Sequence, residues 1–163
     1  MVVSLLRSRL TDYNFNNRPS INIGNIPTKI WVTDYWPRLD LGKNSYPRIS
    51  VMEVTETGEI QDIARNMEYN TRLQIDVWVW AGNDGKDSML LTIAGTVYEG
   101  QKLLDLIAMD VKHALDDKKS DFNTSFNILH DYKLFAKVDM GQDPDRKQCI
   151  RKRIEIGFNY FRG

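Results

Sequence analysis

The stretch Leu73–Trp80 (LQIDVWVW) decides how this chain folds, because two kinds of residue alternate along it. Leucine, isoleucine and valine occupy the odd positions, whereas Gln74, Asp76, Trp78 and Trp80 occupy the even ones. Successive side chains of a β-strand point to opposite faces, so the pattern predicts a strand with one apolar face. The even face carries two tryptophans beside a carboxylate. Since a domain in water seldom leaves such side chains exposed, we expect a neighbouring subunit, or a second layer of the same chain, to cover this face.

A helix that can cover the odd face is predicted further along the chain. From Gly100 onward, apolar residues recur at the three- and four-residue spacing of one helix face, and charged residues fall on the other side. The apolar residues are Leu103, Leu104, Ile107, Val111, Ala114 and Leu115. We therefore expect the principal helix to run for about five turns and to end near Asp116 and Asp117.

Several other segments have the patterns of short helices and strands. A short amphipathic helix is expected within Val2–Asn14. Strands are expected at Lys29–Tyr35, which Trp36 and Pro37 end, at Pro47–Thr55 with a bulge near Val51, and at Tyr132–Val138 and Cys149–Phe161. Leu90–Ile93 and Thr96–Tyr98 predict a small hairpin that turns at Ala94 and Gly95, with a helix upstream of Gly100 as the competing interpretation.

The segment Glu56–Thr71 has two interpretations. It is either a long loop, or the outward continuation of its two flanking strands as an arm that bends at Arg65 and Asn66. We favour the arm, because long loops without regular structure are uncommon inside compact domains. The predicted fold is thus a single α+β domain over residues 1–163. It has a small, mostly antiparallel sheet packed against one long helix, a short N-terminal helix and a protruding β-hairpin arm.

Composition excludes several classes of protein. The 163 residues include 22 basic and 22 acidic ones, and this balance argues against binding nucleic acid by bulk electrostatics. The single cysteine, Cys149, excludes an intramolecular disulfide and a cysteine-based zinc cluster. No apolar run is long enough to span a membrane and the N-terminus does not match a secretory signal, so we expect a protein assembled in a cytoplasm.

Residues with catalytic potential are few. His113 and His130 stand apart from each other, which favours ordinary structural roles for both. Asp76, with Glu53 on the preceding strand, is the one candidate pair for a metal-dependent nuclease; the simpler interpretation makes Asp76 a hydrogen-bonding residue of an interfacial sheet face.

One local charge feature is present. The basic cluster near the C-terminus could meet phosphate or an acidic partner, but we favour a solvated strand edge. It comprises Arg146, Lys147, Arg151, Lys152 and Arg153.

The order of these elements resembles that of the tail-terminator and tail-completion proteins of tailed viruses of bacteria and archaea. The resemblance rests on Ile30–Val32, Pro47–Val51, the alternating strand Leu73–Trp80, the segment Tyr98–Ile107 that opens the long helix, and two closing strands. It implies a structural virion protein of the head–tail junction, in the tail or neck, with no catalytic residue, cofactor or metal. It also implies a hexameric ring that caps the tail tube and joins it to the head connector or neck proteins. A head-completion or connector-stopper protein is the alternative within the same class.

A ring of identical subunits needs two different contact patches on each subunit. The candidate interface residues are Trp78, Trp80 and Asp76 on the even face, together with Arg65 and Asn66 in the arm. The zero net charge agrees with a lumen through which DNA passes without specific binding.

Overall fold

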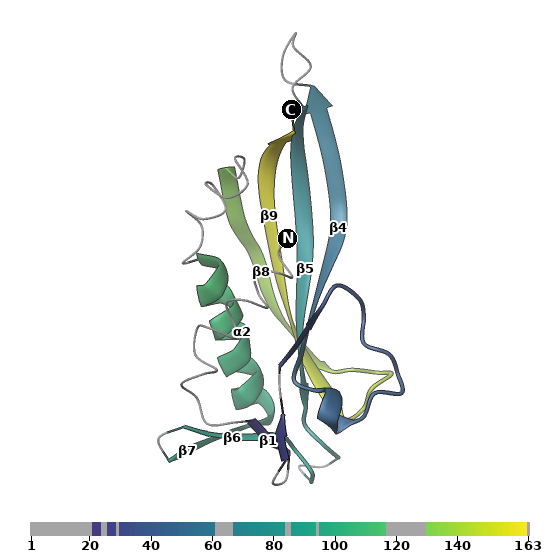
Figure 1. Cartoon of the computed structure of the whole chain (residues 1–163), viewed down its shortest axis with the longest axis vertical. Helices are drawn as coiled ribbons and strands as arrows, with labels where there is room; N and C mark the ends of the chain where they lie inside the picture. Colours follow the sequence, from purple (N-terminus) through teal and green to yellow (C-terminus); the bar gives the residue numbers. More distant parts are fainter. Residues whose placement is uncertain are drawn as a thin grey trace.

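The computed structural model describes residues 21–23, 26–28, 30–60, 67–83, 86–93, 95–116 and 130–162. In these residues the chain forms two sheets and one α-helix (Figure 1). The elements are β1 (Ile21–Ile23), β2 (Ile26–Thr28), β3 (Trp31–Thr33), β4 (Arg48–Ile60), β5 (Met67–Trp80), β6 (Leu90–Ile93), β7 (Thr96–Glu99), α2 (Gly100–Asp116), β8 (His130–Gln142) and β9 (Cys149–Arg162).

The main sheet has the strand order β3-β4-β5-β9-β8. Strand β3 runs parallel to β4, and every other neighbouring pair is antiparallel. The α+β fold class is therefore confirmed, and the sheet is mixed because one of its four strand pairs is parallel. Four of the strands have 13 or 14 residues. At about 3.3 Å per residue such a strand is roughly 45 Å long.

Helix α2 covers one face of this sheet, and it does so as the sequence predicts. The odd residues of β5 are buried against it; Ile75, Val77 and Val79 have no exposed surface. The apolar side of the helix is buried as well. The 17 residues of α2 span only about 26 Å at 1.5 Å per residue, so β4, β5 and β9 extend past its end (Figure 1).

The strands β4 and β5 continue outward into residues 56–60 and 67–71, as the favoured interpretation of this segment predicts. Their pairing continues outward to Ile60 and Met67, with a bulge between Glu53 and Thr55, and β9 accompanies β5 along its whole length. The interpretation of 56–71 as one long loop is therefore wrong. The tip of the hairpin with Arg65 and Asn66, and the expected N-terminal helix, lie outside the described residues.

A smaller sheet, of order β2-β1-β6-β7, lies beside the first turn of α2 (Figure 1). The predicted hairpin is present as β6 and β7. Gly95, at its turn, has a φ of 81°, a left-handed conformation that glycine adopts without steric cost. The competing interpretation of this segment as a helix is wrong. Strand β3, expected at Lys29–Tyr35, is shorter and covers only Trp31–Thr33.

Candidate functional site

The even face of β5, opposite the helix, gathers charged and aromatic side chains from three strands. Antiparallel partners share a face of a sheet, so Arg153 and Arg151 of β9 lie beside Asp76 and Trp78. On the other side of β5, strand β4 places Arg48 opposite Trp78. The face predicted to need a cover therefore holds a network of ion pairs between strands.

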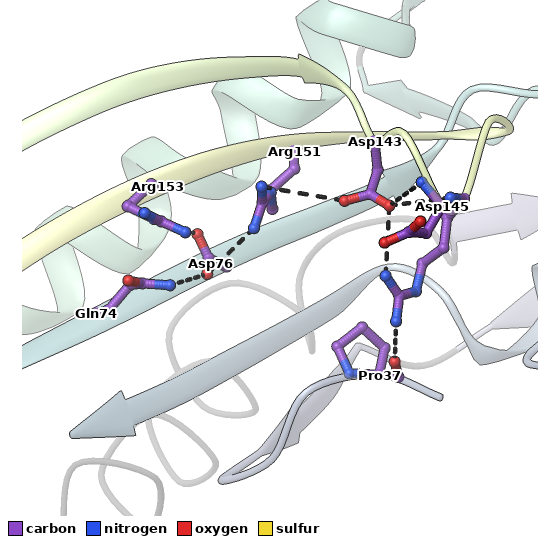
Figure 2. A network of polar contacts seen from close by, with 8 residues as sticks. Pro37, Gln74, Asp76, Asp143, Asp145, Arg151 and Arg153 are labelled. Carbon is purple, nitrogen blue, oxygen red and sulfur yellow. Dashed lines mark hydrogen bonds and ion pairs between the residues drawn. The ribbon is translucent and has the colours of Figure 1, made fainter. Parts of the chain in front are cut away.

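The carboxylate of Asp76 is fully buried and three side chains hold it (Figure 2). Arg153 Nε donates to Oδ1 over 3.1 Å, and Gln74 Nε2 donates to Oδ2 over 2.6 Å. Arg151 Nη1 lies 3.8 Å from the same Oδ2. A carboxylate that has lost its water needs such compensation, because an isolated buried charge is very costly. Asp76 is thus the anion that holds two arginines of the neighbouring strand.

A second buried carboxylate, Asp143, continues the network into the loop between β8 and β9 (Figure 2). Its Oδ1 accepts the backbone N–H groups of Asp145 at 3.1 Å and Arg146 at 2.9 Å, and it also accepts Arg146 Nη1 at 3.3 Å. Its Oδ2 lies 4.0 Å from Arg151 Nη2. Arg146 in turn donates to the carbonyl oxygen of Pro37. Two loops far apart in the sequence are therefore tied together over the sheet.

Tryptophan rings fill the space between these ion pairs. Trp36 meets Trp78 edge to face, with ring centroids 5.1 Å apart and planes at 89°. The guanidinium carbon of Arg151 lies 4.8 Å from the Trp78 centroid and 5.0 Å from that of Trp36, and that of Arg146 lies 5.1 Å from Trp78. Cation–π contacts of this kind stabilise a partly desolvated guanidinium. They compensate Arg146 and Arg151, whose Nε atoms are buried without a hydrogen-bond acceptor in the described structure.

The placement of Trp78 and Asp76 at a subunit interface is therefore corrected. Both side chains are fully buried within one chain, so they have no surface to offer a neighbour. Of the two covers that were expected for this face, a neighbouring subunit or a second layer of the same chain, the structure shows the second. Trp80 is partly buried and packs against Tyr46, with ring centroids 5.8 Å apart. Arg65 and Asn66 lie outside the described residues.

The expectation that the basic cluster lies on a solvated strand edge is also wrong. Strand β9 lies between β5 and β8, inside the sheet. Arg146, Arg151 and Lys152 are buried, and each has a carboxylate partner within the chain. These charges lock strands and loops together.

The nuclease hypothesis required Asp76 and Glu53 to share a metal ion. Strand register places Asp76 opposite Ser50 and Glu53 opposite Leu73, so the two carboxylates point to opposite faces of the sheet. Both oxygens of the Asp76 carboxylate are also already in contact with Arg153 and Arg151. Among the described residues, no group of three or more His, Cys, Asp and Glu side chains is placed to hold a metal ion.

Lys152 points to the other face of β9 and joins the sheet to the helix. Its Nζ donates to Asp105 of α2 and lies 2.9 Å from Asp139 of β8. Burial by itself lowers the pKa of Lys152, but the hydrogen bonds and charges of Asp105 and Asp139 outweigh burial and raise it. The lysine is therefore firmly protonated and pins β8, β9 and α2 to one another.

The single cysteine belongs to the core. Cys149 is buried at the start of β9, beside the buried Tyr46. Burial raises the pKa of the Cys149 thiol from its ordinary value of 9.0 to about 11, and burial also raises the pKa of the Tyr46 hydroxyl. Both groups stay protonated at neutral pH, which gives the thiol little nucleophilic character.

Sequence reasoning missed the residues that close this site: Trp36, Asp143, Arg146 and Arg151. One available signal was parity, since Arg151 and Arg153 alternate with Ile150, Lys152 and Ile154 and so must share one face. No local signal indicated that the segment after β3 would fold back over that face.

No protein-family model matches the chain, and no curated protein shows significant sequence similarity to it. In the described part of the chain, no helix is long and apolar enough to cross a membrane.

Proposed function

We propose that this protein is a structural subunit of the head–tail junction of a tailed virus, most specifically a tail terminator. The observation that carries the proposal is the succession and packing of the elements. The long antiparallel strands β4, β5, β9 and β8 form one sheet whose central strands β5 and β9 pack against α2, in the order that the resemblance to tail-completion proteins implies. A mostly antiparallel sheet with a helix on one face agrees with the fold that the resemblance implies.

The chemistry of the buried face supports a structural role. Asp76, Asp143, Arg146 and Arg151 are engaged with one another, so their charges are used to hold the covering loops on the sheet. These four buried side chains are therefore engaged within the chain, and contacts with a neighbour must use other residues. Exposed apolar side chains occur on the outer strands and nearby loops of the main sheet: Trp31, Tyr35, Leu39, Val138 and Met140.

In this proposal the subunits form a hexameric ring that caps the tail tube and contacts the neck proteins on its other side. DNA passes through the lumen without specific binding. The β4–β5 hairpin is the protruding arm, because its strands run on past the end of α2 (Figure 1). Arg65 and Asn66, which lie outside the described residues, are proposed to contact a neighbouring subunit, and the protein is proposed to reside in the virion after assembly in the host cytoplasm.

Two measurements test the proposal. Light scattering coupled to size-exclusion chromatography should give a closed oligomer of the 19.0 kDa chain, and mass spectrometry should find the protein in purified virions. A protein that is monomeric and also absent from virions would refute it. A map of the virion separates the tail terminator from the head-completion or stopper alternative, since these occupy adjacent layers.

A further inference from the structure

Arg151 of β9 is a buried arginine whose Nε and Nη1 atoms donate no hydrogen bond in the described structure. Two aspartates lie close to its guanidinium group: Asp76 Oδ2 is 3.8 Å from Nη1, and Asp143 Oδ2 is 4.0 Å from Nη2 (Figure 2). A hydrogen bond between charged groups is shorter, at about 2.7–2.9 Å, so both carboxylates are roughly 1 Å too far away. Each aspartate also has a closer arginine, Arg153 or Arg146. Arg151 is therefore attracted by these carboxylates without being hydrogen-bonded to either.

The ring of Trp78 brings further unpaired donors close to Arg151. The guanidinium carbons of Arg151 and Arg146 lie 4.8 Å and 5.1 Å from the ring centroid. Arg146 Nε and Trp78 Nε1 are also buried without an acceptor in the described part of the chain. The ring face stabilises the positive charges, but it accepts no hydrogen bond in the plane of either guanidinium group. We call Arg146, Arg151 and Trp78 the donor cluster. Since buried polar groups nearly always have a hydrogen-bond partner, the donor cluster requires an acceptor.

The charges buried on this face of the sheet are also unequal. Three arginines and two aspartates are buried there: Arg48, Arg146, Arg151, Asp76 and Asp143. Arg153, on the same face, takes a further share of Asp76. Water can accept a hydrogen bond from a guanidinium group, but only an anion offsets its charge where the dielectric constant is low. The acceptor that suits the donor cluster is therefore negatively charged.

We propose that the donor cluster binds a small monovalent inorganic anion of the halide class, such as chloride. The anion accepts hydrogen bonds from Arg151 and from the N–H groups of Trp78 and Arg146. Burial determines the size of the ligand, because the three residues are at most 9% exposed and the loop with Asp143 lies over them. The carboxylate of another protein cannot reach this place without unfolding the cover. Bound there, the anion holds the covering loop on the sheet, which goes beyond the proposed function.

Thermal unfolding in mixtures of sodium chloride and sodium gluconate tests the proposal. The total salt concentration stays constant, so general screening does not change, and gluconate is too large for the site. A ligand that binds only the folded state stabilises it in proportion to the logarithm of its concentration. Once chloride exceeds its Kd, the midpoint of the parent protein should rise by roughly 3–6 °C for each tenfold increase in chloride.

Arg151→Met removes the central donor and leaves the other charges paired. Arg153 keeps Asp76 and Arg146 keeps Asp143, so this variant no longer needs an anion and its midpoint should not respond to chloride. Arg38→Met is the matched control. It removes an arginine whose side chain is 74% exposed, and its midpoint should depend on chloride as that of the parent does.

A crystal of the parent protein grown in sodium bromide locates the anion directly, and this experiment needs no variant to fold. The anomalous signal of bromide should show a peak within about 3.5 Å of Arg151 Nε or Nη1 and of Trp78 Nε1.

Three results would overturn the inference. A parent midpoint that is the same in chloride and in gluconate would show that no such anion stabilises the fold. An Arg151→Met midpoint that rises with chloride as in the parent would place the anion elsewhere. A map with ordered water and no bromide at the donor cluster would show that water is the acceptor. None of these results bears on the proposed function, which light scattering and virion composition test separately.

Discussion

Replacing Asp76 with asparagine tests the buried network most directly. The side chain is fully buried, and its carboxylate compensates Arg153 at 3.1 Å and Arg151 at 3.8 Å. Asp76→Asn keeps the shape and removes the charge. Arg153 then loses its carboxylate partner, and Arg151 keeps only Asp143, at 4.0 Å, which it shares with Arg146. Removing one partner of a buried ion pair typically costs about 3–5 kcal/mol. That is a large part of the roughly 5–15 kcal/mol by which domains of this size are stable.

Urea unfolding followed by tryptophan fluorescence measures this cost, since Trp78 lies inside the network. With a slope near 2 kcal/mol per molar urea, the midpoint should fall by roughly 1.5–2.5 M. The matched control is Asp40→Asn, which removes a carboxylate 2.9 Å from Arg38 where both side chains are well exposed. Exposed pairs contribute under about 1 kcal/mol, so this variant should unfold almost as the parent does.

A double variant separates loss of charge balance from loss of packing. Asp76→Asn combined with Arg153→Met should be more stable than Asp76→Asn alone, because one uncompensated guanidinium is then removed. The reasoning would be refuted by an Asp76→Asn cost no larger than that of Asp40→Asn. Additive costs in the double variant would equally show that the two side chains are not coupled.

Three more outcomes are expected. Trp36→Ala should cost about 3–5 kcal/mol and shift Trp78 emission to the red, because it uncovers Trp78 and Arg151; an unchanged spectrum would contradict the packing described. Lys152→Met should leave the free energy of unfolding within about 1 kcal/mol of the parent value or raise it, since the half-exposed carboxylates of Asp105 and Asp139 regain water. A loss of several kcal/mol in urea unfolding would contradict this. The Cys149 thiol should react slowly with disulfide reagents at neutral pH. The free energy of unfolding should fall between about pH 9 and pH 11, because the Cys149 thiol ionises there in the unfolded chain while it stays protonated in the folded one. A difference in stability between the parent and Cys149→Ala that does not change over this pH range would exclude the thiol as the cause.

Much of the fold could be predicted from local patterns. The alternation of Leu73–Trp80 and the helical spacing from Gly100 each depend on a period that a few neighbouring residues carry, and both elements occur where they were expected. The same period predicted that Ile75, Val77 and Val79 face the helix. Residues 56–60 and 67–71 are mostly polar, so their own pattern left a long loop open as the alternative to the favoured outward continuation of the two strands. Their pairing with each other, and that of 67–71 with β9, shows that they are strands.

Only the part of the candidate site that lies on β5 could be predicted from the sequence. Parity placed Asp76 and Trp78 on a face that had to be covered, but no local signal identified the cover. Arg146 and Arg151 looked like solvated charges because charge runs usually are. Their burial depends on Asp143 and Asp76, which reach them through strand order and a loop contact rather than through sequence proximity.

The sequence by itself determined which residues of β5 point inward, where the long helix lies, and that the face with Trp78 could not remain in water. Periodicity is a property of one segment, so it can be recognised without knowing the rest of the chain. Only the tertiary structure decided that Trp36 and the loop with Asp143 and Arg146 form the cover. The cover depends on charged groups and aromatic rings from distant segments that lie within about 5 Å of one another. Because these groups have lost their water, each charge must be paired.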